Sequence, residues 1–311
     1  MATTNKINGT VKKSKRTQNN KKDPVAIIGM GCRFPGGAHN PEELWQMLVN
    51  KTDAITKIPA DRWDADAMYH PDYTTSGKIS VQNGGFIDEI DKWDAAFFNV
   101  SPLEATRIDP QHRLLLEVSY NAIEDAGLRL EDLNGSGTGV FVGISSHDYG
   151  DIQNAISERT LIGGHTNSGG AQSIAANRIS YTFNLKGPSF IVDTACSSSL
   201  TAIHLACRSI WNGESSMALA GGVSIIVKPE VEMGFSKGGF LSPDGHCKAF
   251  DASANGYIRS EGAGMVLLKP LSKAIEDGDQ IYAVVRGSAI NQDGKTGGIT
   301  VPNPDAQRDV I

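Results

Sequence analysis

The chain has 311 residues, of which 40% are hydrophobic and 7% aromatic, so it can bury a large core in one or two domains. No apolar run approaches the roughly 20 residues that span a bilayer. The first 22 residues are polar and lack the apolar segment of a secretory signal. We therefore expect a cytoplasmic protein that does not bind membranes.

Charge is distributed unevenly along the chain. The basic residues of the first segment, which has no acidic ones, are Lys6, Lys12, Lys13, Lys15, Arg16, Lys21 and Lys22. Subtracting this +7 from the net charge of −6 leaves −13 on residues 23–311, which disfavours nucleic-acid binding. Residues 1–22 also have almost no apolar content. We expect them to be a disordered basic leader, either simply solvated or a docking linker for an acidic partner.

The four cysteines, Cys32, Cys196, Cys207 and Cys247, form neither a dense disulfide framework nor a pair with metal-ligand spacing. His246 and Cys247 are adjacent, but no second ligand pair lies nearby, so they predict a turn. We expect reduced cysteines, no metal and no directly bound cofactor.

Helices and strands are predicted to alternate, which favours a layered α/β fold. Helices are expected from Asn40-Pro41 through Leu48, from the capping box at 101–104, from Asp109-Pro110 to Gly127, and over 168–183 and 271–277. Strands are expected at 25–28, 140–142, 217–226, 265–268 and 281–285. Residues 51–100 predict turns, with no strand that can be placed.

The glycines that follow the first strand, at 29–36, resemble a dinucleotide-binding fingerprint at first sight. Phe34 stands where the third glycine would be, and Pro35 blocks the start of a helix. We therefore do not expect a dinucleotide site.

Cys196 lies in the most informative stretch. Residues 190–192 predict a short buried strand, and after Cys196 come three serines and a helix that ends at Asn212-Gly213. The expected apolar face of that helix consists of Leu200, Ile203, Cys207, Ile210 and Trp211. A thiol at a helix N-terminus lies beside unpaired N–H groups and the positive end of the helix dipole, which favour the nucleophilic thiolate. Cys196 is either a nucleophile for a carbonyl or an inert buried cysteine beside a serine-rich cap.

Several motifs occur in the order found in ketosynthase domains of modular polyketide synthases. They are residues 29–37 (GMGCRFPGG), 109–117 (DPQHRLLLE), 187–189 (GPS), 193–199 (DTACSSS), 241–245 (LSPDG), 248–253 (KAFDAS) and 291–294 (NQDG). The chain resembles this domain, within the wider β-ketoacyl synthase and thiolase-fold group, over residues 24–311.

The resemblance implies a thiolase-like layered fold, in which two similar α/β halves pack about a pseudo-twofold axis. Residues 23–311 would be the N-terminal portion of a ketosynthase domain, with the first half nearly complete through Val285 and the C-terminal half largely missing. The chain stops at Ile311, barely one turn after a helix start with Asp305 as its expected cap, so we expect a cut sequence that exposes apolar surface. The strand at 189–192 would lie at the interface of a homodimer.

The resemblance also implies a reaction. Cys196 would accept a growing acyl chain from the phosphopantetheine thioester of an acyl carrier protein, with its backbone N–H as an oxyanion donor. A malonyl-type extender would then lose carbon dioxide, and its enolate would attack the Cys196 thioester to give a β-ketoacyl chain two carbons longer. The implied partners are the carrier protein and other synthase modules.

Condensing enzymes of this group also use two histidines, in a His-Gly-Thr-Gly-Thr motif and an Asn-x-Gly-His motif downstream of residues 291–294. The seven histidines of this sequence lie elsewhere: His39, His70, His112, His147, His165, His204 and His246. His204 is the nearest to Cys196, but eight residues of helix span about 12 Å, which exceeds hydrogen-bond reach. His112 is expected at a structural helix start. We expect the chain alone to carry a loadable thiol without condensing activity.

Three functions stay open. The leading one is a condensing acyltransferase, and the second is a truncated, condensation-inactive fragment or a scaffold that binds a carrier protein. A degradative thiolase is disfavoured by the DTACSSS context. Loading-type ketosynthases that only decarboxylate have glutamine in place of the nucleophile, and Cys196 argues against that version.

Overall fold

The computed structural model describes residues 22–155 and 159–311, so the predicted basic leader lies outside the described residues except for Lys22. The strands are β1 (Val25–Arg33), β2 (Ile55–Lys57), β3 (Asn83–Gly85), β4 (Gly139–Gly143), β5 (Ser189–Val192), β6 (Ala218–Ser224), β7 (Gly262–Pro270) and β8 (Ala283–Val285). The helices are α1 (Pro41–Val49), α2 (Ala65–Met68), α3 (Pro102–Ala105), α4 (Pro110–Asp125), α5 (Leu130–Leu133), α6 (Asp148–Asn154), α7 (Thr166–Gly170), α8 (Gln172–Thr182), α9 (Ser198–Asn212), α10 (Glu230–Lys237), α11 (Leu271–Asp277) and α12 (Pro304–Val310), with 3-10 turns η1 (Arg159–Leu161) and η2 (Ala195–Ser197).

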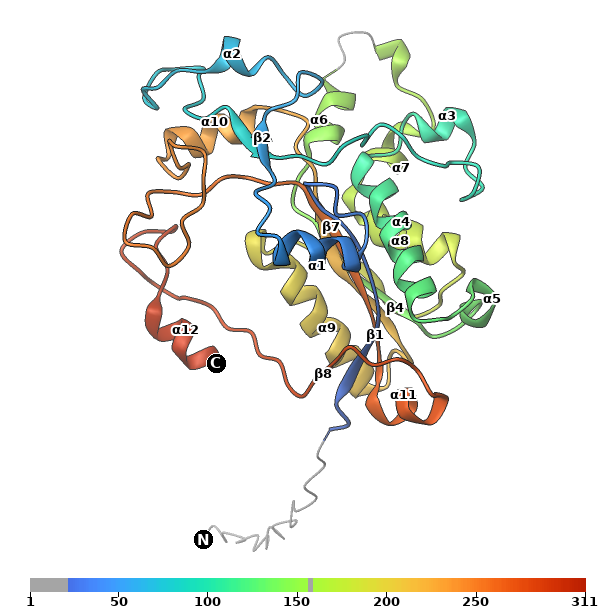
Figure 1. The fold of residues 1–311 in the computed structure, drawn as a ribbon. Coiled ribbons are helices and arrows are strands. Elements are labelled where there is room, and N and C mark those ends of the chain that lie inside the picture. Colours follow the sequence, from blue (N-terminus) through green and yellow to red (C-terminus); the bar gives the residue numbers. More distant parts are fainter. Residues whose placement is uncertain (1–21, 156–158) are drawn as a thin grey trace, which may run out of the picture.

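A six-stranded sheet forms the centre of the fold, in the order β5-β4-β6-β7-β1-β8 (Figure 1). β4 lies parallel to both β5 and β6, whereas β7 pairs antiparallel with β6 and β1, and β8 pairs antiparallel with β1. In the parallel part, Gly143 is paired with Val192 on one side and with Gly222 on the other. The carboxyl ends of β5, β4 and β6 therefore meet at one edge, where open α/β sheets bind their ligands.

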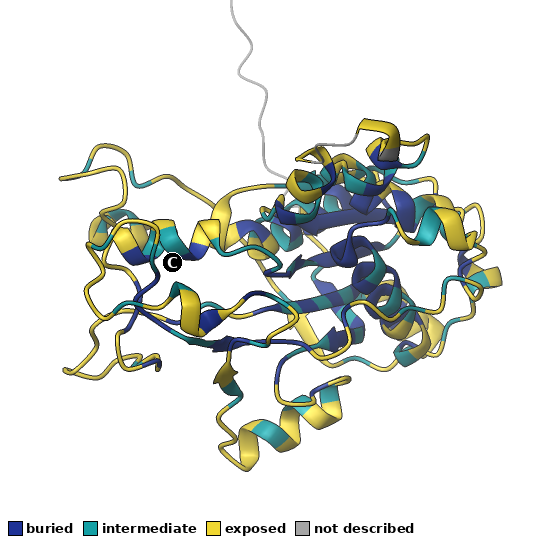
Figure 2. Ribbon diagram, turned by 90° about the horizontal axis from the view of Figure 1, so that it is seen from above, coloured by how far each residue is buried: buried dark blue, intermediate teal, exposed yellow. Residues whose placement is uncertain are grey.

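Helices cover both faces of this sheet. The buried side of α4 and part of α8 pack on one face, where Leu115 and Ile179 belong to the larger hydrophobic core. On the other face, α9 presents Ala202 and Ala206 to Phe141 of β4. Buried residues are concentrated in these layers, whereas the extended segments around them are mostly exposed (Figure 2). The predicted layered α/β arrangement is confirmed.

The glycines of β1 are packing residues. A Cβ atom on Gly29 would overlap the carbonyl oxygen of Ala122, and one on Gly31 would overlap that of Val118. α4 can therefore lie directly against the backbone of β1, and the glycine pattern has no need of a bound phosphate to explain it.

Residues 51–100, where the sequence predicted only turns, form a long excursion that contains the small β2-β3 sheet. It is fastened to the main sheet by Glu261, whose buried carboxylate accepts hydrogen bonds from the N–H groups of Ile87 (2.8 Å) and Ile226 (2.9 Å). Arg62 adds a buried ion pair to the same carboxylate at 3.3 Å. Burial raises the pKa of Glu261, while Arg62 and the two backbone donors oppose the rise.

Two predictions about the elements around Cys196 are wrong. The strand at 190–192 is not buried: β5 is the outermost strand of the sheet, and Phe190 is 41% exposed. Leu200 does not belong to the apolar face of α9, since it is 71% exposed; small residues, Ala202 and Ala206, occupy the contact with the sheet instead. The close approach of α9 to the sheet leaves no room there for a larger side chain.

Two helix boundaries also differ from the prediction. The helix expected at 168–183 is divided into α7 and α8 by Ala171, whose backbone is extended. The break follows a backbone hydrogen bond from the Asp109 N–H to the Gly169 oxygen, which fixes α7 against the start of α4. In α12 the cap is Asn303, not Asp305, because Pro304 occupies the first helical position and the Asn303 side chain accepts from the Asp305 N–H at 3.0 Å.

Replacement of Gly31 tests the contact between α4 and β1. We expect Gly31→Ala to lower the free energy of unfolding by about 2 to 3 kcal/mol, because the new methyl group must displace helix backbone. Gly287→Ala is the matched control, since a Cβ atom there would meet nothing within 4 Å. Urea unfolding followed by circular dichroism measures both; equal stability of the two variants would contradict the packing role.

Candidate active site at Cys196

Cys196 lies in η2, between the end of β5 and the start of α9. The residue before it, Ala195, has a left-handed backbone with φ 53°. This conformation costs a residue with a Cβ atom roughly 1 kcal/mol or more, so the surrounding structure must hold it. The turn leaves the Cys196 side chain exposed at the carboxyl end of the sheet.

Hydrogen bonds fix the backbone on both sides of the thiol. The Asp193 carboxylate accepts from the Ala195 N–H at 3.0 Å, and the Ser197 hydroxyl donates to the Thr194 carbonyl at 2.9 Å. The two 3-10 hydrogen bonds run from Ser197 N–H to the Thr194 oxygen and from Ser198 N–H to the Ala195 oxygen. Neither of them uses the N–H of Cys196, which precedes the first turn of α9.

Two glycines form the platform beneath this turn. A Cβ atom on Gly143 would lie 2.6 Å from the backbone of Ser198 and Ser199, and one on Gly222 would lie 3.0 Å from the Ser199 Cβ. Gly143 ends β4, and Gly222 is its partner in β6. The first residues of α9 therefore rest on the sheet backbone itself. This role was not predicted from the sequence, although a glycine directly after the buried strand at 140–142 was the available signal.

The four cysteines divide into two classes. Cys32 and Cys207 are buried, and burial raises the pKa of each to about 11, with the charge of Glu43 adding to the rise at Cys32. Cys196 and Cys247 are exposed. The Cys247 sulfur accepts a hydrogen bond from the Ile258 N–H at 3.1 Å, so it is tied to the loop that contains it. Exposure makes Cys196 and Cys247 the thiols that a reagent can reach.

Tyr257 lies in the same region and was not predicted. Burial raises its pKa, Arg259 opposes the rise, and Cys196 and Cys247 add to it. Both exposed thiols are thus near enough to Tyr257 to affect its charge. Its ring contacts Phe235 of α10, with the ring centres 5.9 Å apart. The segment that contains Tyr257 is therefore next to the candidate active site, a proximity that residue spacing alone did not indicate.

The histidines nearest in sequence or best placed for chemistry have other contacts. His204, on α9, forms a hydrogen bond with the Ser288 hydroxyl at 2.9 Å, and His246 pairs with Asp53 at 3.1 Å. Neither contact involves Cys196. Within the described ranges, 22–155 and 159–311, no group of three or more His, Cys, Asp or Glu residues is arranged to hold a metal ion. Among the helices of those ranges, none is long and apolar enough to cross a membrane.

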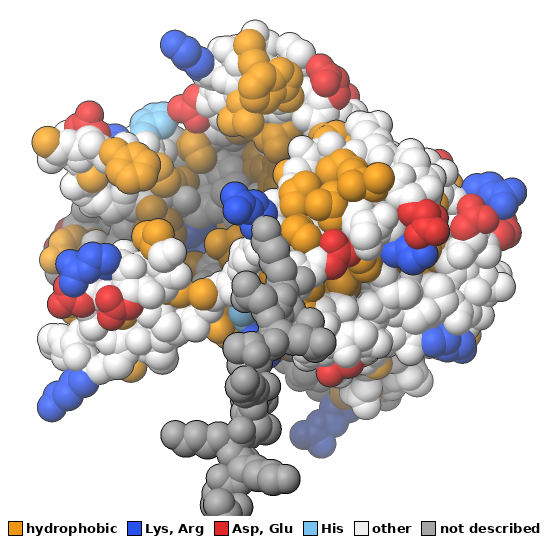
Figure 3. Space-filling view, turned by 90° about the horizontal axis from the view of Figure 1, so that it is seen from below, with side chains coloured by type: hydrophobic (Ala, Val, Ile, Leu, Met, Phe, Trp, Pro, Cys, Tyr) orange, Lys and Arg blue, Asp and Glu red, His pale blue; other side chains and the backbone are white. Residues whose placement is uncertain are grey.

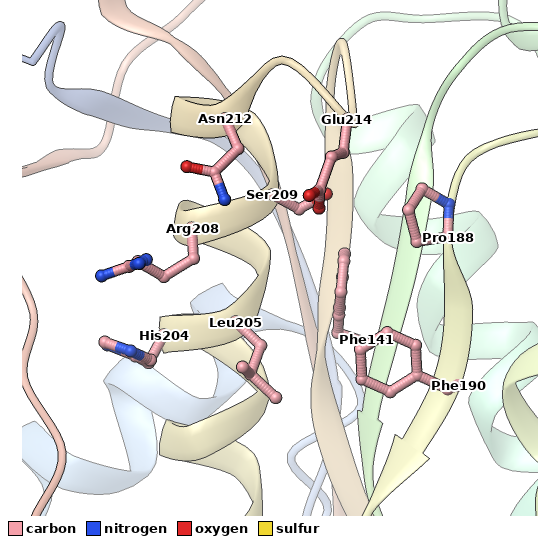
Figure 4. A pocket seen from close by; sticks show the side chains of 9 residues that line it. All are labelled: Phe141, Pro188, Phe190, His204, Leu205, Arg208, Ser209, Asn212 and Glu214. Carbon is pink, nitrogen blue, oxygen red and sulfur yellow. The ribbon is translucent and has the colours of Figure 1, made fainter.

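A groove of about 440 Å³ runs beside β5 on the face covered by α9. Phe141 and Phe190 pack edge to face on one wall, with ring centres 5.0 Å apart, and Leu205 and Arg208 of α9 form the other (Figure 4). The molecule seen from below has several patches of hydrophobic side chains at its surface (Figure 3). The outer edge of β5 thus combines unpaired strand backbone with apolar side chains.

Together the fold and the site define an α/β protein with an exposed cysteine on a left-handed turn between a parallel strand and a helix. Residues 22–274 match the sequence model of the β-ketoacyl synthase N-terminal domain, and the chain belongs to this family. The match confirms the resemblance drawn from the motifs.

Relatives and solved structures agree with this assignment. The chain is 50% identical over 289 residues to a phenolphthiocerol/phthiocerol polyketide synthase from Mycobacterium tuberculosis, covering 93% of this chain and 19% of the relative. It resembles the ketosynthase from module 6 of the bacillaene synthase of Bacillus subtilis 168, with a TM-score of 0.84 and 46% identity over 93% of this chain and 47% of the other. An oxazolomycin ketosynthase domain of Streptomyces albus JA3453 gives a TM-score of 0.87 and 40% identity over 93% and 49%.

These structures show that the fold is thiolase-like, as predicted. The chain spans about half the length of the solved ketosynthases that it matches, and less than a fifth of the M. tuberculosis synthase.

A buried polar cluster lies where α4 begins. Asp109 caps the helix by accepting from the Gln111 N–H at 2.8 Å, and burial raises its pKa to about 6. His112 is fully buried, and within the described ranges its ring nitrogens have no hydrogen-bond partner. Burial, with the charges of Arg178 and Arg113, lowers the pKa of His112 to about 3. The expected structural place of His112 at a helix start is confirmed.

His112 should make stability depend on acid. Below pH 6.5 the unfolded chain binds a proton at this residue, whereas the native state does not until about pH 3. The free energy of unfolding therefore falls as the pH drops, by about 2 kcal/mol between pH 6.5 and 5. His112→Gln should lack this loss. Asp109 acts with the opposite sign in both proteins and cancels in their difference.

Urea unfolding at pH 7 and pH 5 measures the effect, with exposed His39→Gln as the matched control. We expect the control to lose as much stability as the wild type. Equal losses in all three proteins would contradict a neutral buried His112.

Proposed function

We propose that the protein is a ketosynthase of polyketide biosynthesis and that Cys196 is its acyl-accepting nucleophile. The observation that carries the proposal is the exposed thiol on the left-handed turn where β5 enters α9. Family membership supports the reaction class, and the polyketide synthases among the relatives support the pathway.

In the first half-reaction, the Cys196 thiolate attacks the carbonyl carbon of an acyl thioester on the phosphopantetheine arm of an acyl carrier protein. A tetrahedral intermediate forms, and its oxyanion accepts a hydrogen bond from the Cys196 N–H, which the 3-10 turn leaves unused. The carbon–sulfur bond to phosphopantetheine then breaks. The carrier thiol leaves with the proton, and the acyl chain remains on Cys196.

In the second half-reaction, a malonyl-type extender on a carrier protein loses carbon dioxide, and the resulting enolate carbon attacks the Cys196 thioester. A carbon–carbon bond forms, the bond to the Cys196 sulfur breaks, and a β-ketoacyl chain two carbons longer leaves on the carrier. The two histidine motifs that the family uses here are not among the seven histidines of this sequence. We therefore assign to this chain's own residues only the acylation step.

Phosphopantetheine reaches the site as part of the carrier protein, so we propose no resident cofactor and no metal. The proposed partners are the acyl carrier protein, other synthase modules and a second copy of the chain. The second copy would pair along the free edge of β5, where exposed Phe190 borders the groove beside α9.

Acylation of Cys196 tests the proposed function. After incubation with a synthetic acyl thioester, we expect peptide mass spectrometry to find the acyl group on Cys196. Cys196→Ala should abolish labelling, because the nucleophilic sulfur is lost. The matched control is Cys247→Ala, which removes the other exposed thiol and should label like the wild type. An unlabelled Cys196, or labelling of Cys247 alone, would favour the scaffold function instead.

Self-association has its own test. We expect the native protein to be a dimer in sedimentation velocity and Phe190→Lys to weaken the dimer at least tenfold, because a charge replaces an interfacial aromatic group. Ile275→Lys on α11 is the control, since this side chain is also exposed but lies at the other end of the sheet. A monomeric wild type, or equal effects of the two substitutions, would sink the β5 interface.

A further inference from the structure

Of the three serines that follow Cys196, only Ser198 is buried. Ser197 and Ser199 are exposed, whereas Ser198 retains 6% of its accessible surface. Ser198 is also the first residue of α9. Three identical side chains in a row thus have different environments, and the buried one lies beneath the turn that carries the thiol.

The Ser198 hydroxyl forms hydrogen bonds with both peptide groups just before Cys196. It accepts from the Thr194 N–H at 2.9 Å and donates to the Ala195 carbonyl at 2.6 Å. Ala195 is the residue with the left-handed backbone. One oxygen atom therefore closes the turn from the helix side, while Asp193 holds the Ala195 N–H from the strand side.

Ser198 is itself held in place by the sheet. The backbone of Ser198 lies so close to Gly143 that a Cβ atom on this glycine would come within 2.6 Å. Gly222 makes a similar approach to Ser199. The start of α9 cannot move further towards the sheet, so the hydroxyl is a fixed point from which the turn is held.

We propose that Ser198 is a positioning residue for Cys196, because its hydroxyl locks the left-handed turn that presents the thiol and the Cys196 N–H together. The effect on acyl transfer rests on the proposed function, whereas the effect on the geometry of the thiol does not. Without the hydroxyl, the Thr194 N–H and the Ala195 carbonyl lose a partner, and Ala195 is free to leave its strained conformation. The thiol and the N–H then no longer meet a bound thioester in register.

The test compares Ser198→Ala with the matched control Ser199→Ala in the complete native protein. The two changes remove the same hydroxyl group from neighbouring residues, and the hydroxyl of Ser199 is exposed. We expect Ser198→Ala to lower the kcat of acylation by about tenfold to a hundredfold with KM unchanged, since small misplacements of reacting groups cost this much. Ser199→Ala should keep both constants. Ser198→Thr, which retains a hydroxyl, should recover most of the loss.

A second measurement separates positioning from the proposed function. The rate of alkylation of Cys196 by iodoacetamide requires no acyl transfer, and we expect it to fall about tenfold in Ser198→Ala alone, because the thiol leaves the positive end of α9. If the wild type accepts no acyl group, the proposed function fails while the alkylation rates still test Ser198. Wild-type rates in Ser198→Ala, or equal losses in Ser199→Ala, would overturn the positioning role.

Discussion

The geometry around Cys196 depends on direct backbone contact between the central sheet and the start of α9. Gly143 and Gly222 permit this contact, because any side chain there would collide with the first turn of the helix. The short distance forces the chain to reverse sharply after β5, and Ala195 absorbs the reversal in a left-handed conformation. The exposed thiol, the unused N–H of Cys196 and the hydrogen bonds of Asp193 follow from this one constraint.

The same strand connects chemistry and assembly. β5 ends next to the nucleophilic turn, and its outer edge is free in the sheet order. In our account a second copy pairs with that edge, so a change in dimer packing would be transmitted along β5 to the turn at Ala195. Such coupling would need no moving loop, since one four-residue strand borders both the interface and the site.

Much of the fold could be predicted from the sequence, because local signals specify it. Caps and prolines located α1 and α4, and apolar runs located β4, β6 and β7. The excursion at 51–100 could not be predicted, because it is held by Glu261, far away in the chain. The edge position of β5 and the exposure of Leu200 were missed for a related reason: apolar composition does not reveal which face or edge has a neighbour. At the site, Cys196 was evident from its motif, whereas Tyr257 becomes visible only once the fold places it there.

The central claim is that the turn after β5 presents a nucleophilic thiol and an oxyanion donor from one residue. The most direct measurement is a crystal structure of the complete protein after reaction with an acyl thioester. We predict continuous density from the Cys196 sulfur to the acyl group, with the carbonyl oxygen about 2.7 to 3.1 Å from the Cys196 nitrogen. An acyl group bonded to Cys247, or a carbonyl oxygen turned away from the Cys196 N–H, would contradict the account.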